Sequence, residues 1–180
     1  TVEGLREFGF RVFYGDATRL DLLRTAGAGT ARAIVVGVDD IEQSLDIVDL
    51  VRENFPQARI IARARNVTHL FQLRDRGVQD IEREVFESSL RSARSALEAL
   101  GWPAAEAREA SMRFRQRNLK LSDEIYPHYK DRAKLIAANK AGRQQFEEQM
   151  AREREERKLR SGQDWDRLGE DEPAGEAKAP

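Results

Sequence analysis

Short apolar runs alternate with segments of helical periodicity along the first 80 residues. Four apolar, aromatic or β-branched runs predict strands, over Phe10–Tyr14, Ala33–Val38, Arg59–Ala64 and Val78–Ile81. Apolar positions three and four residues apart predict helices between them, over Leu20–Arg24, Ile41–Phe55 and Val67–Leu73. Strands joined by short crossover helices favour a parallel sheet, so the pattern predicts an α/β fold.

Single residues indicate where these helices begin and end. Asp40 and Gln43 have the spacing of a capping box, and Asn66 is a second candidate for an N-cap. The first residues read as the end of a helix that stops at Gly9 and has no capped start. The chain also begins with Thr1. We therefore expect it to be a piece of a longer protein.

The pattern changes after residue 84. Apolar residues on one helical face predict a helix that ends at Gly101, and two more helices are expected over 104–121 and 131–160. Mixed charges in the last of these are typical of an exposed helix with i,i+4 pairs. The sequence thus predicts four segments: a sheet domain over 1–84, helices over 85–121, a charged helical extension over 122–160 and a disordered tail over 161–180.

Charge and composition exclude several classes of protein. The chain has 31 basic and 32 acidic side chains, which argues against a basic nucleic-acid binder and a polybasic membrane anchor. Cysteine is absent, so there is no disulfide framework, thiolate metal site or cysteine nucleophile. No apolar run approaches the ~18–20 residues of a membrane span, and we expect this segment to be soluble.

Residues that could carry catalysis or bind a metal are few. His69 lies beside apolar residues in a predicted helix, which favours a structural role, and His128 lies in a predicted turn. Two isolated histidines provide no metal constellation, so we expect no metal site and no catalytic residue. Asp39 and Asp40 are better explained as charges at a helix N-terminus. A P-loop, a nucleophile elbow and the G-x-G-x-x-G fingerprint are all missing from the sequence.

One turn has the composition of a ligand-binding loop. Gly15, Asp16, Ala17 and Thr18 follow a predicted parallel strand, and ligands of open α/β sheets bind beyond the carboxyl ends of the strands. A turn of small residues lets a purine or ribose approach the backbone, and Asp16 can accept hydrogen bonds. The alternative is a plain turn before a helix, with Asp16 or Thr18 as the N-cap. The four residues alone leave both interpretations open.

Taken together, several segments resemble one protein family. They are Phe8–Gly9, Val12–Arg19, Asp21–Leu23, Ala26–Ala28, Ile60–Arg65, Glu82–Glu84, Phe86–Glu87, Ala96–Glu98 and Arg113–Asn118. They are similar to the cytosolic nucleotide-binding domain (RCK, or TrkA-N type) of Kef-type glutathione-gated potassium efflux antiporters. The Gly-Asp-Ala-Thr turn is shared by potassium-transport nucleotide domains, whereas the segment from Arg83 to Asn118 points more narrowly to the Kef type.

The resemblance implies a fold and explains the abrupt start. The family has a Rossmann-like parallel sheet of six strands in the order 3-2-1-4-5-6. On that template, the chain lacks the first two strands and the glycine loop, and a helical C-terminal extension follows the sheet. The missing strands would lie between the strands at Phe10–Tyr14 and Ala33–Val38. We therefore expect a sheet with a gap.

The resemblance also implies ligands and the residues that bind them. Residues 15–18 would hold the adenosine of a nucleotide, as AMP or NAD(H). Arg83 matches the arginine that contacts glutathione in the family, and Asn118 matches its asparagine. Phe8 matches an aromatic side chain that bulky glutathione adducts displace. Without the resemblance, Arg83 reads as a surface salt bridge with Glu82 or Glu84, Asn118 as an ordinary helix residue and Phe8 as core.

A function and partners follow from the same resemblance. The chain would be a regulatory domain without catalytic turnover, in which glutathione keeps potassium efflux closed and its adducts open it. The expected partners are a second copy of the chain, a transmembrane antiporter domain on the same full-length protein and a flavodoxin-like ancillary protein, but no nucleic acid. The domain would lie at the cytoplasmic face of the inner membrane.

Two other functions remain open at this stage. Residues 104–160, with the charged helix as a docking arm, could make the chain a helical interaction scaffold. A small nucleotide-dependent oxidoreductase would need a Tyr-x-x-x-Lys pair; Tyr126 and Lys130 have that spacing, but Pro127 would disrupt a helix there.

Overall fold

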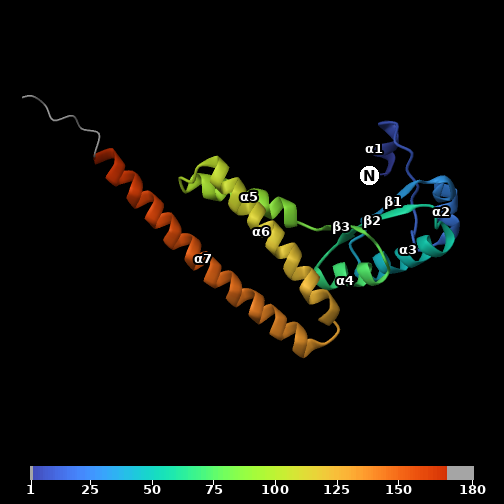
Figure 1. The fold of residues 1–180 in the computed structure, drawn as a ribbon. Helices are drawn as coiled ribbons and strands as arrows, with labels where there is room; N and C mark the ends of the chain where they lie inside the picture. The colour runs from blue at the N-terminus through green and yellow to red at the C-terminus, as the bar shows by residue number, and fades with distance from the viewer. Residues whose placement is uncertain (1, 170–180) are drawn as a thin grey trace, which may run out of the picture. The chain divides into compact units, whose positions relative to one another are not determined.

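Three of the four predicted strands form a parallel sheet in a computed structural model that describes residues 2–169 (Figure 1). The strands are β1 (Ala33–Val36), β2 (Arg59–Ala64) and β3 (Asp80–Arg83), hydrogen-bonded in the order β1-β2-β3. In register, Ala33 lies opposite Arg59, and Asp80 lies opposite Ile61. The carboxyl ends of all three strands therefore meet at one edge of the sheet.

The prediction of a strand over Phe10–Tyr14 is wrong. This segment lies between α1 (Val2–Glu7) and α2 (Leu20–Ala26) as irregular chain, and it pairs with no strand of the described sheet. A strand needs a neighbour to satisfy its backbone N–H and C=O groups, and the strands expected between this run and β1 are not among the described ones. Its aromatic residues are exposed as a result: Tyr14 by 85% and Phe10 by 63%.

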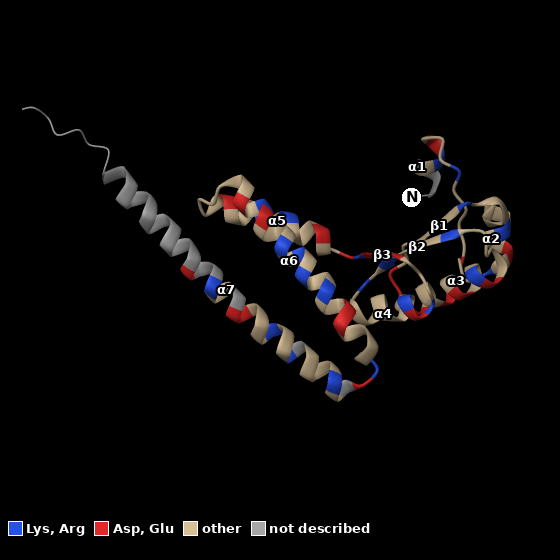
Figure 2. Ribbon diagram, viewed as in Figure 1, with Lys and Arg blue, Asp and Glu red and all other residues tan. Residues whose placement is uncertain are grey.

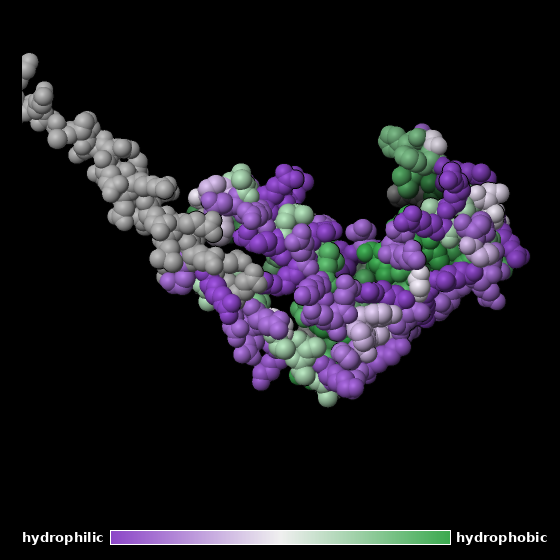
Figure 3. All heavy atoms as spheres, viewed as in Figure 1, coloured by the Kyte–Doolittle hydropathy of each residue, from purple (hydrophilic) through white to green (hydrophobic). Residues whose placement is uncertain are grey.

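Hydrophobic side chains are consequently open to solvent around α1 and beside β1 (Figure 3). Val35 of β1 is 71% exposed although it sits in a strand, and Phe8 is 82% exposed. β1 pairs with β2 along one side only within the described sheet.

The core lies between the sheet and two helices that pack along one of its faces, α3 (Ile41–Asn54) and α4 (Val67–Asp75) (Figure 1). Val48 and Val51 of α3 and Phe71 and Leu73 of α4 are almost fully buried. Alternate residues of β2 are buried with them because successive side chains of a strand point to opposite faces. This three-element core fixes the position of the carboxyl edge.

Both predicted N-caps are confirmed. Asp40 Oδ1 accepts a hydrogen bond from Gln43 N at 2.8 Å, and Asn66 Oδ1 accepts one from His69 N at 2.8 Å. β3 begins two positions later than expected, because Val78 N still bonds to Leu73 O and completes the end of α4 after Gly77, whose φ is +71°.

Two helices that contact each other and run in opposite directions follow the sheet, α5 (Phe86–Ala99) and α6 (Ala104–Ile125) (Figure 1). Glu87 of α5 and Arg115 of α6 form an ion pair at 2.6 Å, and basic and acidic residues intermingle along both helices (Figure 2). α6 also contacts α4, since Arg74 pairs with Asp123 at 2.7 Å. α6 runs past the expected segment boundary at 121, because the first proline in its path is Pro127.

The remaining chain is a separate unit over residues 127–180. It contains the end of the short 3-10 turn η2 (Tyr126–His128) and the long helix α7 (Arg132–Gly169). Asp131 caps this helix by accepting from Ala133 N and Lys134 N. The expected tail over 161–180 begins inside α7, because no proline occurs before Pro173 to stop the helix; residues 170–180 lie outside the described residues.

Across the described residues 2–169, no helix is long and apolar enough to cross a membrane. Over the same range, no group of three or more histidine, aspartate or glutamate side chains is placed to hold a metal ion.

Candidate functional site

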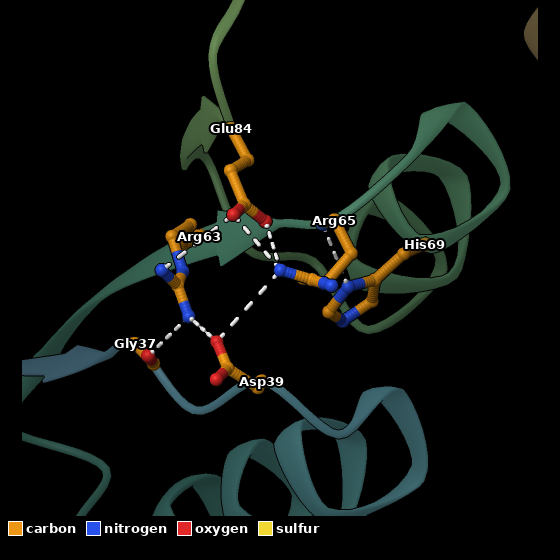
Figure 4. Close-up of polar contacts among 6 residues, drawn as sticks. All are labelled: Gly37, Asp39, Arg63, Arg65, His69 and Glu84. Carbon is orange, nitrogen blue, oxygen red and sulfur yellow. Dashed lines mark hydrogen bonds and ion pairs between the residues drawn. The ribbon is translucent and has the colours of Figure 1, made fainter.

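Four charged side chains meet at the carboxyl ends of the strands, and we call Asp39, Arg63, Arg65 and Glu84 the charged cluster (Figure 4). Arg65 Nη1 donates to both carboxylate oxygens of Glu84, at 2.8 Å each. Arg63 Nη2 donates to Asp39 Oδ1 and, at 2.7 Å, to Gly37 O. Two looser ion pairs, Arg65 with Asp39 at 3.8 Å and Arg63 with Glu84 at 4.0 Å, close the ring of charges.

The sheet explains why these residues meet. Arg63 and Arg65 are two apart at the end of β2, so they share a face, and Glu84 continues the ladder because its N–H bonds to Ala64 O at 2.9 Å. Asp39 follows β1 directly before the cap of α3. Parallel register brings all four to the edge where ligands of α/β sheets bind.

His69 lies beneath the charged cluster, in the core. It is fully buried, its Nδ1 accepts from Arg65 N at 3.2 Å, and its Nε2 is buried without a hydrogen-bond partner among the described residues. Burial, assisted by the positive charge of Arg76, lowers the pKa of His69. His69 thus supports the backbone at Arg65, in keeping with the structural role expected for it.

The turn at residues 15–18 is an Asx-type turn held by its own side chains. Asp16 Oδ1 accepts from Thr18 N at 2.9 Å and from Thr18 Oγ1 at 2.7 Å, and these hydrogen bonds lower the pKa of Asp16. The α2 N-cap is Arg19, without a side-chain cap bond, so neither Asp16 nor Thr18 caps the helix directly. The Gln43 side chain is close enough to contribute to the lowered pKa of Asp16, so the turn lies near the start of α3.

Gly15 is suited to its place in this turn. Its φ is +155°, and an added Cβ would lie 3.0 Å from a methyl carbon of Leu22. Asp16 is exposed while Ala17 and Thr18 are half-buried. The turn therefore presents one ionised carboxylate and small side chains to solvent.

The structure brings Arg83 and Asn118 together. The Arg83 guanidinium, at the end of β3, donates to Asn118 Oδ1 of α6, and it lies 4.2 Å from the centre of the Phe86 ring. Both residues are half-buried, and burial lowers the pKa of Arg83, which nevertheless remains a cation at neutral pH. The salt bridge with Glu82 or Glu84 considered from the sequence is not formed; Glu84 pairs with Arg65 instead.

Phe8 does not join this pair. The aromatic ring over the Arg83 guanidinium is that of Phe86, and Phe8 is 82% exposed at the end of α1. The interpretation of Phe8 as a core residue is therefore wrong for the described chain.

Tyr126 and Lys130 do not form a catalytic pair. The Tyr126 hydroxyl donates to Asp75 Oδ1 at 2.9 Å, and its ring packs on Phe71 at 5.5 Å between centroids. As expected, Pro127 lies just past the end of α6, so the two residues do not share a helix. His128 is exposed in the turn.

Sequence reasoning assigned no site role to the charged cluster. Arg63 and Arg65 were visible only as part of a family-like run, and Asp39 was explained as a helix charge, although the cap is Asp40. The available signal was an Arg-x-Arg spacing at the end of a strand, with acidic residues at the ends of its neighbours.

Family models match most of the chain. Residues 1–83 match the TrkA-N domain, and residues 88–167 match the potassium efflux system KefB C-terminal domain. The chain is 42% identical over 176 residues to the "Glutathione-regulated potassium-efflux system protein KefC" of Salmonella newport (strain SL254) and, over 175 residues, to that of Salmonella paratyphi B. These alignments cover 98% and 97% of the chain but 28% of each relative, so the chain spans less than a third of their length.

A solved structure gives the same result. It is described as "Shewanella denitrificans Kef CTD in AMP bound form"; it is 37% identical, aligns with a TM-score of 0.63 and covers 65% of this chain and 74% of its own. The Rossmann-like α/β class with a helical C-terminal part is thereby confirmed. The family consists of regulatory domains of potassium efflux systems and not of enzymes, so the oxidoreductase alternative is wrong. The chain belongs to the Kef-type family of TrkA-N (RCK) domains of potassium efflux systems.

Proposed function

We propose that this chain is the regulatory ligand-binding domain of a glutathione-gated potassium:proton antiporter. An adenine nucleotide binds at the turn of residues 15–18. Glutathione or its adducts bind at Arg83 and Asn118 and thereby close or open potassium efflux. Family membership supports the transport setting, and the names of the Salmonella relatives include both glutathione regulation and potassium efflux.

The observation that carries the glutathione site is the neutral partner of Arg83. Arg63 and Arg65 face carboxylates, whereas Arg83 faces the amide oxygen of Asn118 and an aromatic ring. Its positive charge is therefore not cancelled by its partner, in a half-buried place where charge–charge attraction is stronger than in water. Glutathione carries two carboxylates, and a guanidinium can bind a carboxylate through two parallel hydrogen bonds.

The nucleotide is assigned to the turn of Gly15, Asp16, Ala17 and Thr18. Asp16 is ionised, and one of its oxygens is occupied by Thr18, which leaves the other able to accept from the hydroxyls of a ribose. AMP in the Shewanella relative supports an adenine nucleotide over other ligands; NAD(H) is the alternative that shares the adenosine group.

Partners and gating complete the proposal. Bulky adducts would displace Phe8, whose ring is 82% exposed. Residues 85–121 would provide the contact with a second copy, and a membrane antiporter domain on the same full-length protein would receive the signal at the cytoplasmic face of the inner membrane. A flavodoxin-like ancillary protein is a further partner, for which no residues are assigned.

Replacing Arg83 tests the glutathione site. In the full-length gene product that carries these 180 residues, Arg83→Ala should abolish inhibition of potassium efflux by glutathione, because the cation that binds the ligand is lost. Arg91→Ala is the matched control, since Arg91 is an exposed arginine on the neighbouring helix α5. Efflux from proteoliposomes and calorimetric titration with glutathione give the two readouts.

The outcomes separate the site from the function. If Arg83→Ala keeps full inhibition by glutathione while Arg91→Ala behaves as the wild type, the assignment of Arg83 is wrong. A parallel titration of Asp16→Asn with AMP, with Asp21→Asn as control, checks the nucleotide site without reference to transport.

A further inference from the structure

The link between the sheet and the helix pair is strained. Val85 has φ +57° and ψ −3° at the start of α5, and it is the one non-glycine residue with positive φ that the described part of the chain contains. The left-handed region is unfavourable for L-residues and more so for a β-branched side chain. Val85 is also 68% exposed, so burial of its side chain does not compensate for the strain.

The residues before Val85 are held at two points. Glu84 is fixed to β2 through its N–H to Ala64 O and through both carboxylate oxygens to Arg65. Arg83 is fixed to α6 through Asn118. Since successive side chains of a strand point to opposite faces, these two attachments hold the chain from opposite sides.

The residues after Val85 depend on its conformation. Val85 O accepts hydrogen bonds from Ser89 N at 2.8 Å and from Ser88 Oγ at 2.9 Å, so the first turn of α5 is built on this carbonyl. A strained conformation persists only where its surroundings over-determine it. Weakening either attachment therefore changes the direction in which α5 leaves the sheet.

The Glu84 attachment also leads toward the proposed nucleotide site. Arg65 and Arg63 both contact Asp39. The next residue, Asp40, caps α3 by accepting from Gln43 N, and the Gln43 side chain lies near Asp16. The start of α3 thus lies between Asp16 and the charged cluster, and the cluster ends at Glu84, one residue from Arg83.

We propose that Arg65, Glu84 and Val85 are positioning residues that couple the two ligand sites. A nucleotide at residues 15–18 orders the charged cluster, which keeps Glu84 on Arg65, holds Val85 in its strained conformation and so points Arg83 at its ligand. The inference rests on the proposed function. Coupling of this kind is reciprocal, so glutathione must also strengthen nucleotide binding.

Calorimetry on the full-length gene product tests the coupling. The quantity measured is the ratio of the glutathione dissociation constants without and with saturating AMP. We expect a ratio of about 5 or more in the wild type, within the usual range for coupled sites. Glu84→Gln and Val85→Gly should bring the ratio to about 1, and Glu84→Asp should restore part of it. Glu82→Gln is the control, because Glu82 is an exposed carboxylate on the same strand.

Thermal unfolding separates positioning from simple damage. Val85→Gly should raise the unfolding temperature, because glycine adopts positive φ without strain, and yet lose the coupling. If Val85 acted on stability alone, loss of coupling would accompany a lower unfolding temperature and not a higher one. An unchanged ratio in Glu84→Gln and Val85→Gly, or a wild-type ratio of 1 with both ligands bound, overturns the inference and leaves the proposed function standing. A wild type that binds neither ligand overturns both.

Discussion

At the scale of residues, His69 shows how a titratable side chain can serve only as a support. Its Nδ1 accepts a backbone hydrogen bond, which requires the neutral ring, and burial lowers its pKa. The folded state thus binds a proton less readily than the unfolded chain. Stability from this source is present above about pH 6.5 and is lost as the pH falls toward the lower pKa of the folded state.

Urea unfolding at several pH values checks this expectation. The free energy of unfolding should fall by at most about 1.4 kcal/mol per pH unit below pH 6.5 on account of His69. His69→Gln should remove that part of the slope, whereas His128→Gln should keep it, since His128 is exposed. Equal slopes in the wild type and His69→Gln would contradict the role of His69.

At the scale of elements, α3 and α4 begin where a short polar side chain binds the free N–H groups. Asp40 and Asn66 each do so at 2.8 Å. Because these caps are local, α3 and α4 begin where a window of four residues indicates. They also fix the first turns of α3 and α4, beside the charged cluster.

Removing either cap should weaken the domain. Asp40→Ala and Asn66→Ala should each lower the free energy of unfolding by about 1 kcal/mol, because N–H groups at the helix start lose their acceptor. Asp46→Ala, on the exposed face of α3, should change it by less than about 0.5 kcal/mol. Denaturant unfolding of the three variants measures the difference; equal losses at Asp40 and Asp46 would speak against the cap.

Local signals also predicted β2 with its observed bounds, because Arg59–Ala64 is a short run rich in apolar and β-branched residues. They failed for Phe10–Tyr14, because a run with strand composition still needs a partner from elsewhere in the chain. The charged cluster was missed for the same reason: Arg63 and Asp39 are 24 residues apart, and Arg65 and Glu84 are 19 apart. The contact of Arg83 with Asn118 spans 35 residues and was approached only through the family resemblance.

At the scale of the whole molecule, the chain divides after Tyr126. The residues assigned to ligands all precede this division, and the mixed-charge helix α7 follows it. The interaction-scaffold alternative over residues 104–160 includes α6 of the first unit and α7 of the second, and it can coexist with ligand binding in the first.

Shortening the protein tests this division. Deleting residues 141–180 from the full-length gene product should leave the affinities for AMP and glutathione unchanged, because the assigned residues lie in the first unit. Deleting only residues 170–180 is the control for loss of the chain end. If the longer deletion alone abolished glutathione binding, α7 would be part of the ligand site.

The ion pairs between β2 and β3 have a consequence for folding. Arg59 with Asp80 and Arg65 with Glu84 lie near the two ends of this strand pair and on the same face. A slip of one residue would turn both acidic side chains toward the apolar core, where an unpaired charge is costly. The two ion pairs therefore favour one alignment of the last strand over the neighbouring registers, in which both carboxylates would lose their arginine partners.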